Sequence, residues 1–139
     1  MRLFRKILIP VDFSDYCKRA IAECATLFAG DEPMDFYFVH VWRLPAEYVD
    51  WADDPGPEML EKLRSFVGEF PHAGQHTTHF VLLTGHPATA LCKLAKEHEF
   101  DLIALATHGR TGLAHLLIGS TAEQIVRHAA CPVLTLRLP

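Results

Sequence analysis

The segment DLIALATHGRTGLAHLLIGSTAEQIVRHAACPVLTLR, residues 101–137, decides the fold of this chain. It begins with an aliphatic run at Asp101–Ala106. A second run starts at Cys131 and continues one residue past the segment to Leu138, and both runs are typical of buried strands. Between them, a glycine-punctuated connection over 107–118 leads into a helical repeat of apolar residues at about Ser120–His128. A strand, a helix and a strand in this order predict parallel pairing through a right-handed crossover.

The same alternation runs through the residues before this segment. Three further strands are predicted at Arg5–Val11, Asp35–Trp42 and His79–Thr84. Three further helices are predicted from the N-cap Ser14 to about Phe28, with Gly30 as its C′ residue, from Glu58 to Phe70, and from Pro87 to about His98. We therefore expect one domain, residues 1–139, of the α/β class: a single doubly wound, Rossmann-like, five-stranded parallel sheet with strand order 3-2-1-4-5 and helices on both faces.

One residue conflicts with this pattern. Pro10 has no N–H to donate to a ladder, yet it stands in a run expected to form a central strand. The conflict disappears if Pro10 is the last residue of that strand, where the chain already leaves the sheet. Asp12 would then project from the carboxyl edge of the sheet.

Composition excludes several classes of function. The chain has 139 residues, a formal net charge of −4 and interspersed acidic and basic residues. No apolar run approaches the roughly 20 residues that span a bilayer, so we expect neither a nucleic-acid nor a membrane partner. The cysteines show no paired spacing and are interpreted as buried free thiols, which indicates a reducing, cytoplasmic location; they are Cys17, Cys24, Cys92 and Cys131.

Two features belong at the carboxyl edge of the parallel sheet, where folds of this class bind ligands. Asp12 directly follows the first strand, and the segment Ala106–Gly112 directly follows the fourth. The glycines of this segment and Gly119 let the backbone approach a ligand without a Cβ in the way. Free N–H groups at the start of the last helix, with the charge of Arg110, favour an anion such as phosphate. The Asp12 carboxylate would accept hydrogen bonds from a ribose.

The start of the last helix also fits an arrangement without any ligand. Ser120-Thr121-Ala122-Glu123 matches the S/T-x-x-E capping box, in which side chains satisfy the first free N–H groups. Glu123 would also place negative charge near a bound phosphate. From the residues alone, phosphate binding and simple helix capping both remain open.

Three segments resemble the universal stress protein family: KILIPVDFSD at 6–15, FVHVW at 38–42 and the quoted segment at 101–137. The nucleotide-binding branch of that family carries the motif G-x2-G-x9-G-(S/T). Here nine residues separate Gly109 from Gly119, and Ser120 follows, so the second half of the motif is intact. Ala106 replaces the first glycine, which is a minor change if this position keeps strand conformation and an obstruction if it must form a turn.

The resemblance implies that an adenine nucleotide, expected to be ATP, binds at this edge, with Mg²⁺ or Mn²⁺ able to bridge its phosphates. Asp12 would contact the ribose, and Val41 main-chain groups would meet the adenine edge. The segment after the fourth strand would wrap the ribose and phosphates, and the start of the last helix would supply hydroxyl and backbone donors. The implied nucleotide-binding residues are Pro10, Val11, Asp12, Val41, Ala106, Thr107, His108, Gly109, Arg110, Gly112, Gly119, Ser120 and Thr121.

Nothing in the sequence assigns a catalytic or metal-binding role. The spacing of His72, His76 and His79 is suggestive, but no cysteine or carboxylate lies among them, so no metal site is expected. His40 is interpreted as a structural histidine. Because the chain shows no activated nucleophile, no acid–base carboxylate pair and no P-loop lysine, we expect no catalytic residue and at most slow ATP hydrolysis.

The last strand is expected at the edge of the sheet, where a long apolar strand needs a cover. Pairing with the same strand of a second copy would give a two-fold homodimer, and the resemblance implies the same. The leading hypothesis is a dimeric nucleotide-binding stress sensor whose loop Arg43–Pro57 responds to occupancy. The alternatives are a protein-interaction module of the same fold without nucleotide, and a phosphotransferase or adenylating enzyme. The sequence indicates no particular downstream protein partner.

Overall fold

The computed structural model describes residues 4–30, 32–43, 55–70, 76–108 and 118–138. Its strands are β1 (Lys6–Pro10), β2 (Asp35–Trp42), β3 (Thr77–Thr84), β4 (Leu102–Ala106) and β5 (Val133–Leu136). Its helices are α1 (Asp15–Leu27), α2 (Gly56–Val67), α3 (Pro87–Glu97) and α4 (Ser120–His128). All strand pairs are parallel and the sheet has the order β3-β2-β1-β4-β5. The predicted α/β fold and its strand order are therefore confirmed.

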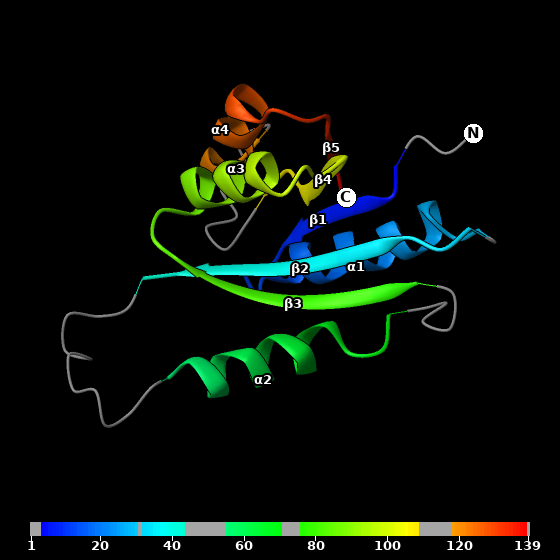
Figure 1. Cartoon of the computed structure of the whole chain (residues 1–139), viewed down its shortest axis with the longest axis horizontal. Helices are drawn as coiled ribbons and strands as arrows, with labels where there is room; N and C mark the ends of the chain where they lie inside the picture. Colours follow the sequence, from blue (N-terminus) through cyan, green and yellow to red (C-terminus); the bar gives the residue numbers. More distant parts are fainter. Residues whose placement is uncertain (1–3, 31, 44–54, 71–75, 109–117, 139) are drawn as a thin grey trace.

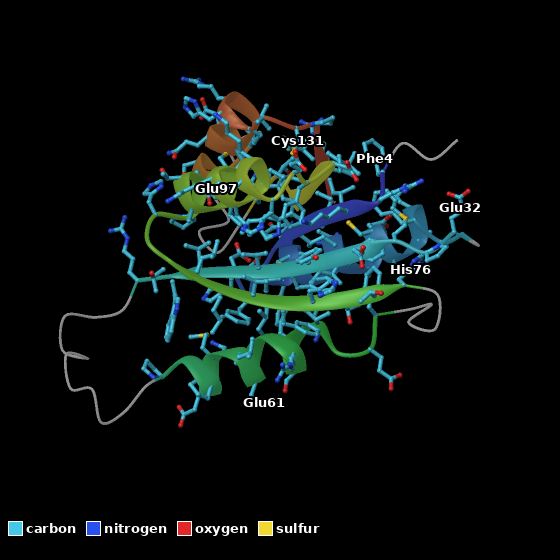
Figure 2. All side chains as sticks on the ribbon, viewed as in Figure 1. Phe4, Glu32, Glu61, His76, Glu97 and Cys131 are labelled. Atoms are coloured by element: carbon cyan, nitrogen blue, oxygen red, sulfur yellow. The ribbon has the colours of Figure 1, made fainter. Side chains whose placement is uncertain are left out.

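The sheet separates two apolar layers, with α1 and α2 on one face and α3 and α4 on the other (Figure 1). Because successive strand residues point to opposite faces, Ile7 and Ile9 of β1 pack in the first layer and Leu8 packs in the second. These three side chains are almost completely buried. Figure 2 shows side chains filling the space between the sheet and the helices. A continuous apolar strand is thus the expected signature of a sheet covered on both faces.

Pro10 is the last residue of β1, which resolves the conflict between a proline and a central strand. β4 pairs with β1 at Ile7 and Leu8, which precede the proline. The chain then stays beside β2 for one more bond, since the Val11 N–H donates to the Val39 carbonyl at 2.8 Å. The proline therefore marks the exit from the sheet, and the turn that follows carries Asp12 to the carboxyl edge.

Two helix ends differ from the prediction. α1 ends at Leu27, and its cap is Phe28, whose N–H donates to the Cys24 carbonyl at 2.9 Å. Gly30 is not in the left-handed region, so its assignment as the C′ glycine was wrong. α2 ends at Val67 instead of Phe70, because the left-handed Gly68 (φ 64°) turns the chain at that point.

Four strands also differ in length from the prediction: β1 lacks Arg5 and Val11, β4 lacks Asp101, and β3 and β5 have other bounds. β3 begins at Thr77, earlier than predicted, because Asp35 of β2 offers it a pairing partner. β5 is shorter than predicted, because the β4 ladder available to it spans only Ile103–Ala106. Its predicted place at the edge of the sheet is confirmed.

The cysteines are free thiols, as predicted. Cys17 and Cys24 are buried on the inner face of α1, whereas Cys92 and Cys131 are only half-buried. Among the helices that the structure describes, none has the length and apolar character to cross a bilayer.

Candidate functional site

A cavity of about 270 Å³ opens where β1 and β4 end, at the point where the strand order reverses. We call it the crevice, and its lining residues come from β1, β2, β4, the loops that follow β1 and β4, and the starts of α1, α3 and α4. They are Ile9, Pro10, Val11, Asp12, Cys17, Ala20, Val39, His40, Val41, Pro87, Leu91, Leu105, Ala106, Thr107, His108, Gly119, Ser120, Thr121 and Ala122.

The fold brings the predicted site residues together. All of those within the described part of the chain line the crevice, namely Pro10, Val11, Asp12, Val41, Ala106, Thr107, His108, Gly119, Ser120 and Thr121. Gly109, Arg110 and Gly112 lie outside the described residues. Residues as far apart in sequence as Pro10 and Thr121 therefore share one cavity, because parallel strands end at the same edge.

Asp12 stands in a tight turn between β1 and α1. Its Oδ1 atom accepts hydrogen bonds from the Ser14 N–H at 2.9 Å and from the Ser14 hydroxyl at 2.6 Å. Ser14 in turn caps α1, since its Oγ accepts from the Cys17 N–H at 3.1 Å. No described residue bonds the second carboxylate oxygen, Oδ2. Asp12 thus has one oxygen engaged in the turn and one available as an acceptor.

Among the described residues, no side chain caps the start of α4. Its N-cap is Gly119, in extended conformation (φ −70°, ψ 160°), and Ser120 is the first helical residue. The Glu123 carboxylate turns instead to Arg127, one turn along the helix, at 2.7 Å. The capping-box alternative was therefore wrong: within the described chain, the first N–H groups of α4 keep no side-chain acceptor and remain at the crevice.

The two ends of the connection between β4 and α4 are tied together. The Gly119 N–H donates to the Thr107 carbonyl, and the Thr107 N–H donates to the Leu136 carbonyl at 3.1 Å. Thr107 is buried, which fixes the point at which the chain leaves β4. The start of α4 is thereby held against the end of β4, although these two residues are separated by a long connection.

Ala106 keeps strand conformation. It is the last residue of β4, pairs with Leu136 of β5 and lines the crevice. Its φ is not in the left-handed region, so the position does not require glycine. The replacement of the first motif glycine therefore adds one methyl group to the crevice wall.

Sequence reasoning missed the apolar wall of the crevice. Ile9, Val39 and Leu105 precede the strand ends, and Pro87 with Leu91 comes from the start of α3. Their signal was present, because residues one to three positions before a strand's carboxyl end, and the start of the helix that follows β3, lie near the same edge. Apolar walls of this kind hold the flat face of a ring rather than its polar groups.

His40 and Cys17 are the polar groups of the wall that the motif did not indicate. His40 is buried (9% exposed) and lies 2.7 Å from the Val11 carbonyl through Nδ1, which agrees with a structural role. Cys17 donates a thiol hydrogen bond to the Pro10 carbonyl at 3.5 Å. Burial raises the pKa of the Cys17 thiol to about 12, so it is protonated at neutral pH and is not an activated nucleophile.

The histidines do not form a metal site in the part of the chain that the structure describes. His76 accepts a hydrogen bond from the Met34 N–H at 3.1 Å, and His79 stacks on Tyr37 with ring centroids 4.2 Å apart. Both lie toward the amino ends of the strands, whereas Asp12 lies at the carboxyl ends. His108 borders the crevice, with its Nδ1 3.2 Å from the Thr107 hydroxyl.

The arrangement offers three kinds of interaction in one cavity. The apolar wall can hold a ring, Asp12 Oδ2 can accept hydrogen bonds from hydroxyl groups, and the start of α4 can receive an anion. A ligand that carries a ring, hydroxyl groups and a phosphate would satisfy all three.

Comparisons of this chain with family models and with individual proteins agree on one family. The sequence model of the Universal stress protein family matches residues 3–137. Universal stress protein MJ0531 of Methanocaldococcus jannaschii is 31% identical over 151 aligned residues, which cover 99% of this chain and 84% of that protein. A universal stress protein of Thermus aquaticus, encoded in the 3′ region of a QAH/OAS sulfhydrylase gene, is 30% identical, with 97% of this chain and all of that protein covered.

Solved structures show the same fold. The protein MJ0577 superposes with a TM-score of 0.85 at 23% identity and 99% coverage of each chain. A universal stress protein solved in complex with cAMP gives 0.71 at 20% identity, covering 99% of this chain and 100% of the other. A family protein of Arabidopsis thaliana with AMP bound gives 0.65 at 22% identity, covering 97% and 92%.

Proposed function

This chain belongs to the universal stress protein family, and on that premise we propose that its crevice binds an adenine nucleotide. The observation that carries the proposal is the uncapped start of α4, which lines the same cavity as the half-engaged carboxylate of Asp12. Free N–H groups at a helix start favour phosphate, and the carboxylate favours ribose hydroxyls. The apolar wall between them receives the base.

Two relatives of the same fold support this choice of ligand. One was solved with cAMP and another with AMP, so the fold accommodates adenine nucleotides in other proteins. In this chain, Val41 lies at the crevice wall on β2, where its main chain would meet the edge of the base. Thr107 and His108 would border the sugar, and Gly119, Ser120 and Thr121 would face the phosphates.

We further propose that ATP is the physiological nucleotide and that the protein acts as a dimeric, cytoplasmic stress-response sensor. Asp12 is the only carboxylate among the described lining residues, and they form no cage of ligands for a metal ion. A divalent cation would therefore be held mainly by the phosphate oxygens of the nucleotide, which it would bridge. The dimer would form through the free edge of β5. The described lining groups include no activated nucleophile, which favours a binding protein over an enzyme.

Titration calorimetry of the purified protein with ATP and Mg²⁺, AMP and cAMP tests the proposal. We expect saturable binding, and we expect Asp12→Asn to weaken it about 10- to 100-fold, because a hydrogen bond to a charged acceptor contributes about 1.5–3 kcal/mol. Asn keeps an acceptor for Ser14 but presents an amide to the ribose. Asp15→Asn is the matched control, since Asp15 is an exposed acid on the first turn of α1 and does not line the crevice.

The result that contradicts the proposal is the absence of heat with every nucleotide at millimolar concentration from a folded protein. The protein-interaction alternative would then stand. Equal weakening by the two Asp variants would instead show that general charge, and not Asp12, determines binding. Release of ADP measured at high protein concentration tests whether bound ATP is hydrolysed.

A further inference from the structure

Phe13, the residue after Asp12, has an unusual backbone. Its φ is 64°, in the left-handed region that bulky residues rarely adopt. A glycine would adopt this conformation without strain. The chain keeps a phenylalanine at this position, so contacts of the ring must offset the strain of the backbone.

The ring of Phe13 packs against three side chains. Its centroid lies 4.5 Å from that of His40 and 5.3 Å from that of Phe66, with the Phe66 ring edge-on. The Lys62 ammonium lies over the Phe13 ring, 4.3 Å from its centroid. β2 and α2 therefore hold the ring from two directions.

His40 contacts both neighbours of Asp12. Its ring packs at a tilt of 53° against the ring of Phe13, and its Nδ1 lies 2.7 Å from the carbonyl oxygen of Val11. A carbonyl oxygen can only accept, so Nδ1 carries the proton and donates it. One buried side chain thus fixes the residue before Asp12 by a hydrogen bond and the residue after it by ring packing.

We propose that Phe13 and His40 are positioning residues that hold the Asp12 carboxylate in the crevice. The left-handed turn at Phe13 brings the Ser14 N–H and hydroxyl onto Asp12 Oδ1, which leaves Oδ2 for the ligand. The assignment of that ligand as a ribose-bearing nucleotide rests on the proposed function. The positioning itself rests on the contacts of the turn and needs no ligand.

A double-mutant cycle separates positioning from a general effect on the fold. The variants are Asp12→Asn, Phe13→Gly and the two together, and the measurement is the dissociation constant for AMP. We expect Phe13→Gly to weaken binding about tenfold by releasing the turn, while the glycine itself accepts the backbone conformation without strain. In that background Asp12→Asn should cost less than threefold, compared with tenfold or more in the natural sequence.

Phe13→Tyr is the conservative variant and should restore the natural affinity, because it keeps the ring. His40→Phe keeps a ring but loses the donor to Val11, so it should weaken AMP binding and also reduce the effect of Asp12→Asn. If Asp12→Asn costs the same factor in every background, the contributions are independent and the positioning role is wrong.

Amide hydrogen exchange of Ser14, followed by NMR, decides the question without a nucleotide. Its N–H bonds Asp12 at 2.9 Å, so we expect exchange to accelerate at least tenfold in Phe13→Gly and to return to the natural rate in Phe13→Tyr. The Val11 amide, bonded to Val39 in the sheet, is the internal control and should not change. An unchanged Ser14 rate would overturn the inference even if nucleotide binds. If no nucleotide binds but Ser14 responds as expected, the proposed function fails while the positioning of Asp12 stands.

Discussion

Cys17 and Cys24 lie one above the other on the inner face of α1, and each has a pKa raised from 9.0 to about 12, mainly by burial. Burial excludes the water that would solvate a thiolate, so both side chains are held neutral at physiological pH. Single residues therefore decide the chemistry of the crevice wall: Cys17 contributes a neutral thiol, and Asp12 contributes a carboxylate.

The raised pKa of the two thiols predicts a loss of stability in alkali. Below pH 9 the folded and unfolded chains bind the same thiol protons, so the contribution to stability is complete. Between pH 9 and 12 the unfolded chain loses these protons first, and stability falls by about 1.4 kcal/mol per pH unit for each thiol.

Urea denaturation across this pH range measures the slope. Cys24→Ala should reduce the slope by about 1.4 kcal/mol per pH unit, which is the contribution of one thiol. Ala22→Ser on the exposed side of α1 adds no titrating group and should leave it unchanged. A slope that is the same with and without Cys24 would show that other groups control the alkaline transition.

Gly68 and Gly30 provide a test of backbone strain. Gly68 has φ 64° and ψ −150°, which L residues rarely adopt, although a Cβ there would meet no atom within 4 Å. Gly68→Ala should therefore destabilise the protein by about 1–3 kcal/mol through strain alone. Gly30 is equally open but lies outside the left-handed region, so Gly30→Ala should be neutral or stabilise by up to about 1 kcal/mol. Thermal or urea unfolding of the two variants gives the comparison, and equal effects would refute the strain argument.

At the scale of elements, the starts of α1 and α4 contrast. α1 begins with Ser14, whose side chain satisfies a free N–H of the first turn. α4 begins with Gly119 and has no such acceptor among the described residues. Both helix starts adjoin the crevice, and among the described residues no side chain accepts from the first N–H groups of α4. The unsatisfied start of α4 is thus a local loss of stability that suits anion binding.

Gly119→Ser should exchange function for stability. The extended backbone at this position suits an N-cap, and a serine hydroxyl there would accept from the first turn of α4. We expect the free energy of unfolding to rise by a few tenths of a kcal/mol. We expect nucleotide affinity to fall about tenfold, since the cap competes with a phosphate for the same N–H groups.

Gly119→Ala is the control for this variant. Alanine gives no cap, so stability should fall by about 1 kcal/mol while the N–H groups remain available. Unfolding and calorimetry on both variants provide the two readouts. Unchanged affinity in Gly119→Ser would show that the α4 donors do not contact the ligand.

At the scale of the whole molecule, two apolar layers share one sheet, whose edge strands are β3 and β5. β5 is a four-residue edge whose side chains are all half-buried. The Ile103 N–H donates to the Pro132 carbonyl and the Thr107 N–H donates to the Leu136 carbonyl, each at 3.1 Å. Even-numbered residues of β5 therefore face β4, so the backbone of Thr135 faces outward.

Thr135→Pro tests the proposed dimer. Proline at this position removes an outward N–H and leaves the β4–β5 ladder intact, so we expect a folded monomer of 15.6 kDa by light scattering, against twice that mass for the natural chain. Leu134→Pro is the contrasting variant, because it removes an inward N–H and should destabilise the fold itself. A dimer that persists in Thr135→Pro would exclude the β5 edge and direct attention to β3.

Much of the molecule could be predicted from its sequence. Hydrophobic periodicity located every strand and helix, and Pro10 was correctly expected to end its strand. Helix ends were less predictable: Phe28, not Gly30, caps α1, because Phe28 leaves helical geometry (φ −103°, ψ 14°) and the next N–H, that of Ala29, donates to the Thr26 carbonyl in a tighter turn. The Ser120–Glu123 pattern was misleading for a related reason, since Glu123 has a closer partner in Arg127. A local motif indicates which hydrogen bonds and ion pairs can form at a helix end, and the neighbouring residues in the fold determine which of them do form.

What the sequence determined by itself was the alternation of apolar runs, and through it a parallel sheet whose carboxyl edge gathers Asp12, Ala106 and Gly119. Pattern suffices here because burying apolar side chains on both faces of each strand is the dominant energetic term. Only the tertiary structure decided the conformation of Phe13, the contacts of His40 and the open start of α4. These depend on small differences between competing local bonds, which are settled by residues far away in the chain.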